Sequence, residues 1–103
     1  MSTTYDELLD SVRGLAENLR AIQELGIAQY TPVVRQIIRT RCRDAQHIQH
    51  TLDHLLDYAC HPDGLALFKT LCRYYLQIDP AATADYVNIY REMWDSDEEE
   101  DLP

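Results

Sequence analysis

The stretch from Thr31 to Cys60 constrains the fold most, because it predicts one helix of about 30 residues with two different faces. Thr31-Pro32 is a start signal, since Thr caps helices and Pro suits the first helical position. His61-Pro62-Asp63-Gly64 is a stop signal. The apolar face carries two interleaved seven-residue series, typical of a coiled-coil-like helix: Val34, Ile38, Ala45, Ile48, Leu52, Leu55 and Ala59.

The predicted helix is longer than a small core requires. At about 1.5 Å per residue it would extend about 45 Å, in a chain of 103 residues. Three arrangements accommodate the excess length. One end projects, the helix kinks, or a second copy packs along it to form a homodimer.

Three more helices are predicted, at about 4–25, 64–77 and 80–94. The first carries one apolar stripe, with members at alternating steps of four and three: Leu8, Val12, Leu15, Leu19 and Ile22. Gly26 is expected to end this helix in a left-handed conformation, and a close helix crossing would explain Gly14. Asp79-Pro80 repeats the cap-then-proline signal at the start of the last helix.

The last two predicted helices supply the rest of the expected core. Residues 64–77 are expected to bury Leu65, Phe68, Leu71, Cys72 and Tyr75. Residues 80–94 are expected to bury Ala84, Val87, Tyr90 or Arg91, and Trp94. No segment alternates as a strand does. The sequence therefore predicts an all-α bundle of about four helices, with the first helix antiparallel to the second.

The charge is concentrated at one end of the chain. The net charge is −9, and residues 95–101 hold six of the 18 acidic residues and no basic residue. Without them, residues 1–94 have a net charge of −3. We therefore expect a single helical domain over 1–94 and a disordered acidic tail over 95–103.

A basic strip lies on the face opposite the apolar series of 31–60, at four-residue steps: Arg35, Arg39 and Arg43. Three binding partners fit it: the chain's own 95–101 segment, an acidic protein surface or nucleic acid. The negative body weighs against direct nucleic-acid binding. Ordinary surface charge remains the alternative to all three.

Arg41 falls within the apolar series, where Val34, Ile48 and Leu55 call for a hydrophobic residue. A buried guanidinium without a carboxylate is costly. Arg41 is therefore expected either to pair with an acid such as Glu17 or Asp79, or to face a partner chain.

Histidines extend the polar face toward the C-terminal end of the predicted helix. At about 100° per residue, four side chains fall within about 60° of one another: His50, His54, Asp57 and His61. Two histidines at i and i+4 can bind one metal ion, although the residues of any established metal-site pattern are missing. Solvated surface residues and a pH-sensitive interface are the competing interpretations.

Tyrosine is abundant, with seven residues. Tyrosine is favoured in interfaces because it combines a large rigid surface with a polar tip. Tyr74, Tyr86, Tyr90 and Trp94 could form one aromatic surface, and packing in the core or at its edge is the alternative.

No catalytic constellation, cofactor motif or disulfide framework is evident. Cys42, Cys60 and Cys72 are odd in number and form no CxxC pair. Cys60 and His61 are adjacent, and adjacent helical side chains point about 100° apart, which is poor geometry for a nucleophile and its base. No apolar run approaches the ~18 residues that span a membrane, and no signal-peptide core is present. We expect a cytoplasmic protein that is not an enzyme.

The sequence restricts the function to a class. The leading hypothesis is a small acidic module for protein–protein interaction, acting as an inhibitor, adaptor or antitoxin-like regulator, including an anti-defence protein of a mobile element. A DNA mimic and an acidic secretion chaperone are the alternatives. The partner-contacting residues expected are Arg39, Arg43, His50, His54, Tyr74, Tyr86 and Tyr90.

Overall fold

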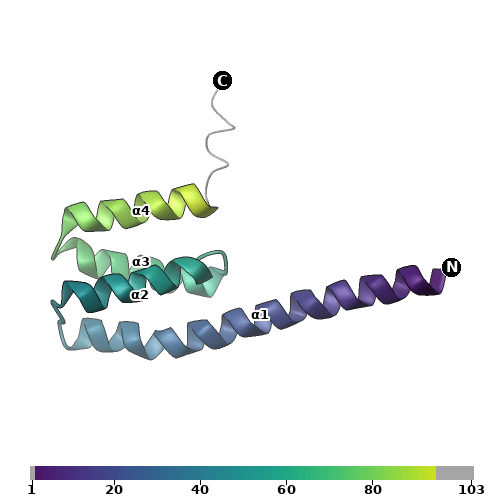
Figure 1. Ribbon diagram of the computed structural model, residues 1–103. Coiled ribbons are helices and arrows are strands. Elements are labelled where there is room, and N and C mark those ends of the chain that lie inside the picture. The colour runs from purple at the N-terminus through teal and green to yellow at the C-terminus, as the bar shows by residue number, and fades with distance from the viewer. Residues whose placement is uncertain (1, 95–103) are drawn as a thin grey trace, which may run out of the picture.

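The computed structural model describes residues 2–94, with side chains from Thr4 onward. These residues form four α-helices and no strand: α1 (Ser2–Arg39), α2 (Ala45–Tyr58), α3 (Pro62–Leu76) and α4 (Pro80–Trp94) (Figure 1). The expected all-α bundle is therefore confirmed. The predicted acidic tail, 95–103, lies outside the described residues.

The first boundary differs from the prediction, because α1 continues through Gly26 and Pro32 to Arg39. No glycine in the described chain has a positive φ, so Gly26 is an ordinary helical residue. Thr31 does not cap a new helix. Its hydroxyl donates a hydrogen bond to the Ile27 carbonyl one turn back, at 2.8 Å, a bond that a threonine inside a helix commonly makes.

The break falls instead within the segment predicted as one long helix. Arg41 has a φ of 53°, its N–H donates to Ile38 O at 3.2 Å, and the Cys42 N–H donates to Ile37 O at 2.9 Å. This pair of bonds is the Schellman motif that ends many helices. Asp44 then caps α2, accepting from the Gln46 and His47 N–H groups.

Arg41 is therefore not a charge within an apolar face, and that prediction was wrong. Its side chain is exposed, and the residue occupies the left-handed position of the turn between α1 and α2. Neither Glu17 nor Asp79 forms an ion pair with it. Among the described residues, one basic side chain lies beside an acidic one, His61 at 3.9 Å from Glu24, and the two form an ion pair when the imidazole is protonated.

The core lies between the second half of α1 and the other three helices (Figure 1). Its fully buried side chains are Val34, Ile37, Ile48, Thr51, Leu52, Leu55, Leu71 and Tyr75. The last half of α1 runs antiparallel to α2. The predicted antiparallel pairing of 4–25 with 31–60 was wrong, because 4–25 and 31–39 belong to the same helix. The α3 prediction holds for Phe68, Leu71, Cys72 and Tyr75, which are all buried, whereas Leu65 is only partly buried.

Two glycines allow the helices to approach closely around Tyr58. A Cβ atom at Gly26 would overlap the Tyr58 ring, and a Cβ atom at Gly64 would overlap the Tyr58 backbone carbonyl. Gly26 thus lets α1 cross the end of α2, and Gly64 lets α3 turn back against it. No atom lies within 4 Å of a Cβ built at Gly14, so no helix crosses there in the described structure.

Most of the first part of α1, residues 4–25, extends beyond the end of the bundle (Figure 1). We call these residues the arm. The prediction that its apolar stripe joins the core was wrong. Exposure of these side chains is 64% for Leu8, 60% for Val12, 62% for Leu15, 55% for Leu19 and 60% for Ile22.

Candidate interaction surfaces

The arm has an apolar face that no described residue covers. In a seven-residue register labelled a to g, Tyr5, Val12 and Leu19 occupy the a positions, and Leu8, Leu15 and Ile22 occupy the d positions. We call these six residues the arm seam. The seven charged side chains of the arm all occupy b, c or f positions: Asp6, Glu7, Asp10, Arg13, Glu17, Arg20 and Glu24.

The e and g positions beside the arm seam therefore carry no charge. They are small, polar or apolar: Thr4, Leu9, Ser11, Ala16, Asn18, Gln23 and Leu25. A helix in a bundle typically has one such wide uncharged face buried and its charged face in water. The arm has the residue pattern of a packed helix and the exposure of an unpacked one.

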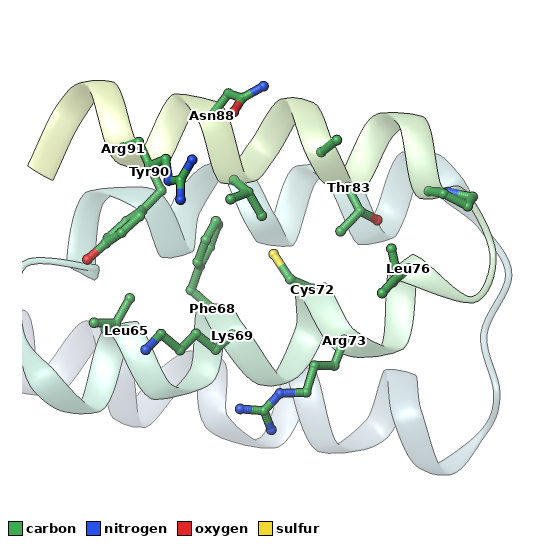
Figure 2. Close-up of a pocket in the computed structure, with 13 residues that line it drawn as sticks. Leu65, Phe68, Lys69, Cys72, Arg73, Leu76, Thr83, Asn88, Tyr90 and Arg91 are labelled. Atoms are coloured by element: carbon green, nitrogen blue, oxygen red, sulfur yellow. The ribbon is translucent and has the colours of Figure 1, made fainter. Parts of the chain in front are cut away.

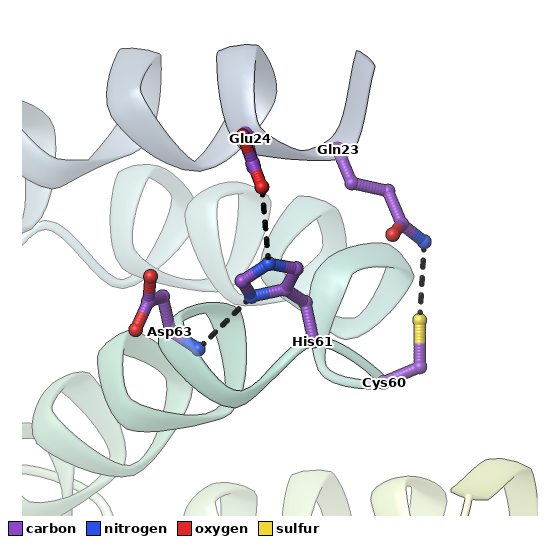
Figure 3. A network of polar contacts seen from close by, with 5 residues as sticks. All are labelled: Gln23, Glu24, Cys60, His61 and Asp63. Atoms are coloured by element: carbon purple, nitrogen blue, oxygen red, sulfur yellow. Dashed lines mark hydrogen bonds and ion pairs between the residues drawn. The ribbon is translucent and has the colours of Figure 1, made fainter. Parts of the chain in front are cut away.

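Polar contacts hold the arm to the bundle where it leaves α2 and α3 (Figure 3). The Gln23 amide donates to the Cys60 Sγ atom at 3.3 Å, and His61 Nε2 lies 3.9 Å from Glu24 Oε1. His61 Nδ1 also accepts from the Asp63 N–H at 3.1 Å, which caps α3. These contacts set where the free part of α1 begins.

A second surface is an open groove between α3 and α4, with a volume of about 470 Å³ (Figure 2). Phe68 and Cys72 of α3 and Val87 of α4 line it, and Phe68 stacks on Tyr90 with ring centroids 5.7 Å apart. The lining includes three cations, Lys69, Arg73 and Arg91, and no carboxylate.

One thiol, that of Cys72, lines the groove. Burial raises the pKa of the Cys72 thiol to about 12. A thiol must ionise to act as a nucleophile, so Cys72 is a packing residue. The groove can accept an apolar segment flanked by acids.

The residues predicted on the polar face are dispersed by the turn at 40–44. Arg39 lies near the end of α1, where it donates to the Gln36 side chain at 3.2 Å, and Arg43 is exposed in the turn. Pairing of this strip with 95–101 lies outside the described residues.

The predicted histidine cluster is only partly formed. His50 and His54 are in edge contact, with ring centroids 4.5 Å apart, and His54 also stacks on Tyr30 of α1 at 5.4 Å. His61 instead caps α3, and Asp57 is exposed. Within residues 2–94 no three His, Cys, Asp or Glu side chains are grouped so that they could hold a metal ion.

The predicted aromatic surface does not form. Tyr86 is 8% exposed, and its hydroxyl donates to Asp53 Oδ1 at 2.8 Å. Burial first, and then Asp53, raise its pKa well above the ordinary value. Tyr74 is half-buried, and its hydroxyl donates to Cys42 O at 2.6 Å. Trp94 donates its indole N–H to Leu56 O at 2.8 Å. These tyrosine tips hold the bundle together.

Sequence reasoning assigned the wrong face of α4 to the core. The buried residues are Thr83 and Tyr86, whereas Ala84 and Val87 line the groove. Ala84, Val87 and Arg91 lie on one helix face, so the apolar pattern predicted that face to be buried. The sequence does not show that Thr83 and Tyr86, on the neighbouring face, find hydrogen-bond partners and can be buried instead.

Comparisons with protein-family models, with curated proteins and with solved structures found no match to this chain. No helix within residues 2–94 combines the length and the apolar character needed to cross a membrane. The function must therefore be inferred from the arm and the groove themselves.

Proposed function

We propose that this protein is a helical module for protein–protein interaction whose arm packs against a helix of another polypeptide. The single observation that carries the proposal is the exposure of the arm seam. In an ordinary bundle helix these residues would be buried, and each is more than half exposed here.

Physical reasoning favours a covered arm. Helices gain most of their stability from packing an amphipathic face, and an isolated helix is marginal in water. Large contiguous apolar patches on soluble proteins also mark interaction sites. An inhibitor, an adaptor or an antitoxin-like regulator would use such an arm to recognise one amphipathic helix.

The test compares two glutamate substitutions in the arm. Leu19→Glu places a charge in the arm seam, and Ala21→Glu places the same charge at an exposed c position. Full-length protein and both variants would be immobilised and exposed to a lysate of the source cell, and retained proteins identified by mass spectrometry. We expect a protein retained by wild type and by Ala21→Glu and lost with Leu19→Glu. The same retained set for all three would contradict the proposal.

The secretion-chaperone hypothesis is a second candidate, because an exposed apolar surface is what such a chaperone presents to an unfolded effector. It predicts that the arm binds extended, unfolded chains as well as folded helices. A peptide series that compares a helix-forming sequence with its proline-substituted version separates the two. The DNA-mimic hypothesis depends on acids at 95–101, and deleting 95–103 tests it directly.

A further inference from the structure

We propose that the arm pairs with the arm of a second copy of this chain, antiparallel, to form a two-chain assembly with a bundle at each end. This inference rests on the proposed function, and it identifies the partner of the arm seam as a second copy of the chain. Five features of the arm lead to it: its register, its flanking residues, its direction relative to the bundle, its extent, and its area.

The register is self-complementary in the antiparallel direction. When Val12 faces Leu15 of the second copy, Leu8 faces Leu19 and Tyr5 faces Ile22. By symmetry the same three pairs recur, so all six seam residues of each copy meet a seam residue of the other. Antiparallel helices pack in this way when a positions meet d positions along a seven-residue repeat.

The flanking residues create no repulsion between copies. Like charges at e and g positions would discourage self-pairing, and no e or g position of the arm is charged. The five acids and two arginines of the arm point away from the seam into water. A heterologous helix chosen by charge would instead be expected to find charges beside the seam.

The direction of the arm seam favours an antiparallel pair over a parallel one. At about 100° per residue, the arm seam and the buried face of α1 at Ile27, Val34 and Ile37 point within about 60° of each other. In a parallel pair, both bundles would therefore lie at the same end and on the inner side of the two α1 helices, where they would crowd each other. In an antiparallel pair, each bundle lies beyond the far end of the other arm.

The extent of the free helix fits this arrangement. The bundle ends at the contacts of Gln23 with Cys60 and of Glu24 with His61, and the pairing described above ends at Ile22. The paired stretch, 5–22, is thus the part of α1 that the bundle leaves uncovered (Figure 1).

The area is sufficient for a specific interface. Six large side chains per copy, each more than half exposed, offer roughly 100 Å² apiece, or roughly 1,200 Å² for the pair. A specific interface needs about 1,000 Å² in total. The pairing clears that threshold by a modest margin, so we expect dissociation at low concentration.

Sedimentation of the full-length protein over a concentration series tests the pairing. We expect the mass of two chains for wild type and Ala21→Glu at micromolar concentration, and at least a tenfold weaker association for Leu19→Glu. Trp94 fluorescence verifies that the bundle remains folded in each variant, because its indole is bonded to α2. A single-chain mass for wild type up to about 100 µM would overturn the proposal, as would equal association of both variants.

Disulfide cross-linking tests the direction, in a Cys60→Ser background that removes the exposed native thiol. Leu8→Cys chains mixed with Leu19→Cys chains should cross-link, and neither alone should do so. Cross-linking of Leu8→Cys to itself would overturn the antiparallel arrangement. If wild type sediments as one chain while lysate capture still depends on Leu19, the proposed function stands and the self-pairing fails. If capture is also independent of Leu19, both fail.

Discussion

Replacing Gly64 with alanine should destabilise the bundle strongly, because the new methyl group has no room. The Cβ atom would overlap the carbonyl carbon and oxygen of Tyr58. These are backbone atoms at the end of α2, so no side-chain rotation relieves the contact, and the junction between α2 and α3 must open. The neighbouring His61 and Cys60 contacts to the arm would shift with it.

The magnitude follows from two opposing effects. Alanine in place of glycine gains up to about 1 kcal/mol of helix propensity. Overpacking costs about 1–3 kcal/mol, and more where the neighbour is rigid. We expect a net loss of about 2 kcal/mol in the free energy of unfolding. With a denaturant slope of about 1–2 kcal/mol per molar urea, the midpoint falls by about 1–2 M.

Urea unfolding followed by Trp94 fluorescence and by circular dichroism measures the change. Gly14→Ala is the matched control, since the same methyl group meets no atom within 4 Å there. The control should keep or raise the stability of the arm. An unchanged or raised urea midpoint for Gly64→Ala would refute the close approach of α3 to Tyr58.

Three further predictions concern the turn and the thiols. Arg41→Gly should stabilise the protein by about 1 kcal/mol, because the left-handed conformation of Arg41 costs an L-residue about 1–2 kcal/mol; a lowered melting temperature would contradict this. Burial raises the pKa of Cys72 from 9.0 to about 12, so above pH 9 the unfolded chain loses a proton that the folded chain keeps. The contribution of Cys72 to stability is therefore present below pH 9 and falls by about 1 kcal/mol at pH 10. This loss should be missing from Cys72→Ala in urea titrations at both pH values. Iodoacetamide at pH 8 should label the exposed Cys60 in the folded protein and the buried Cys72 only after unfolding, and mass spectrometry showing equal labelling would contradict the burial of Cys72.

The helices with strong local signals could be predicted from the sequence. The segments predicted at 64–77 and 80–94 correspond to α3 and α4, each of which begins at a proline. Asp79 caps α4 ahead of Pro80, as predicted, by accepting from the Ala82 N–H. His61 caps α3 ahead of Pro62 with its ring nitrogen, where the sequence analysis predicted only a stop signal. Proline favours the first turn because it lacks the N–H that would be unpaired there.

The same signal failed at Thr31-Pro32 because its outcome depends on packing. Thr31 can cap a helix or bond back to Ile27, and the structure shows the second. The buried residues Ile27 and Val34 lie on either side of Pro32, so a continuous helix keeps both in contact with the bundle. The cap at Asp44 was overlooked because the apolar spacing continues across it.

The α4 prediction was displaced by one residue because apolar character was the criterion. Thr83 and Tyr86 are buried with their hydroxyls bonded, to Asp79 O and to Asp53 and Gln49 respectively. A buried polar group costs little when it is paired, and partners on α2 cannot be identified from the sequence of α4. Val87, which was predicted to be buried, lines the groove instead.

The arm shows what hydrophobic periodicity does and does not determine. The spacing of Leu8, Val12, Leu15, Leu19 and Ile22 predicts a helix with one covered face, and the helix is present. The spacing contains no information about whether the cover belongs to the same chain. Only the arrangement of the bundle answers that, because the bundle ends at the connection between α2 and α3, where Cys60 and His61 contact Gln23 and Glu24. The arm seam lies before those contacts. Covering it requires a second surface, which one copy of this chain does not supply among its described residues.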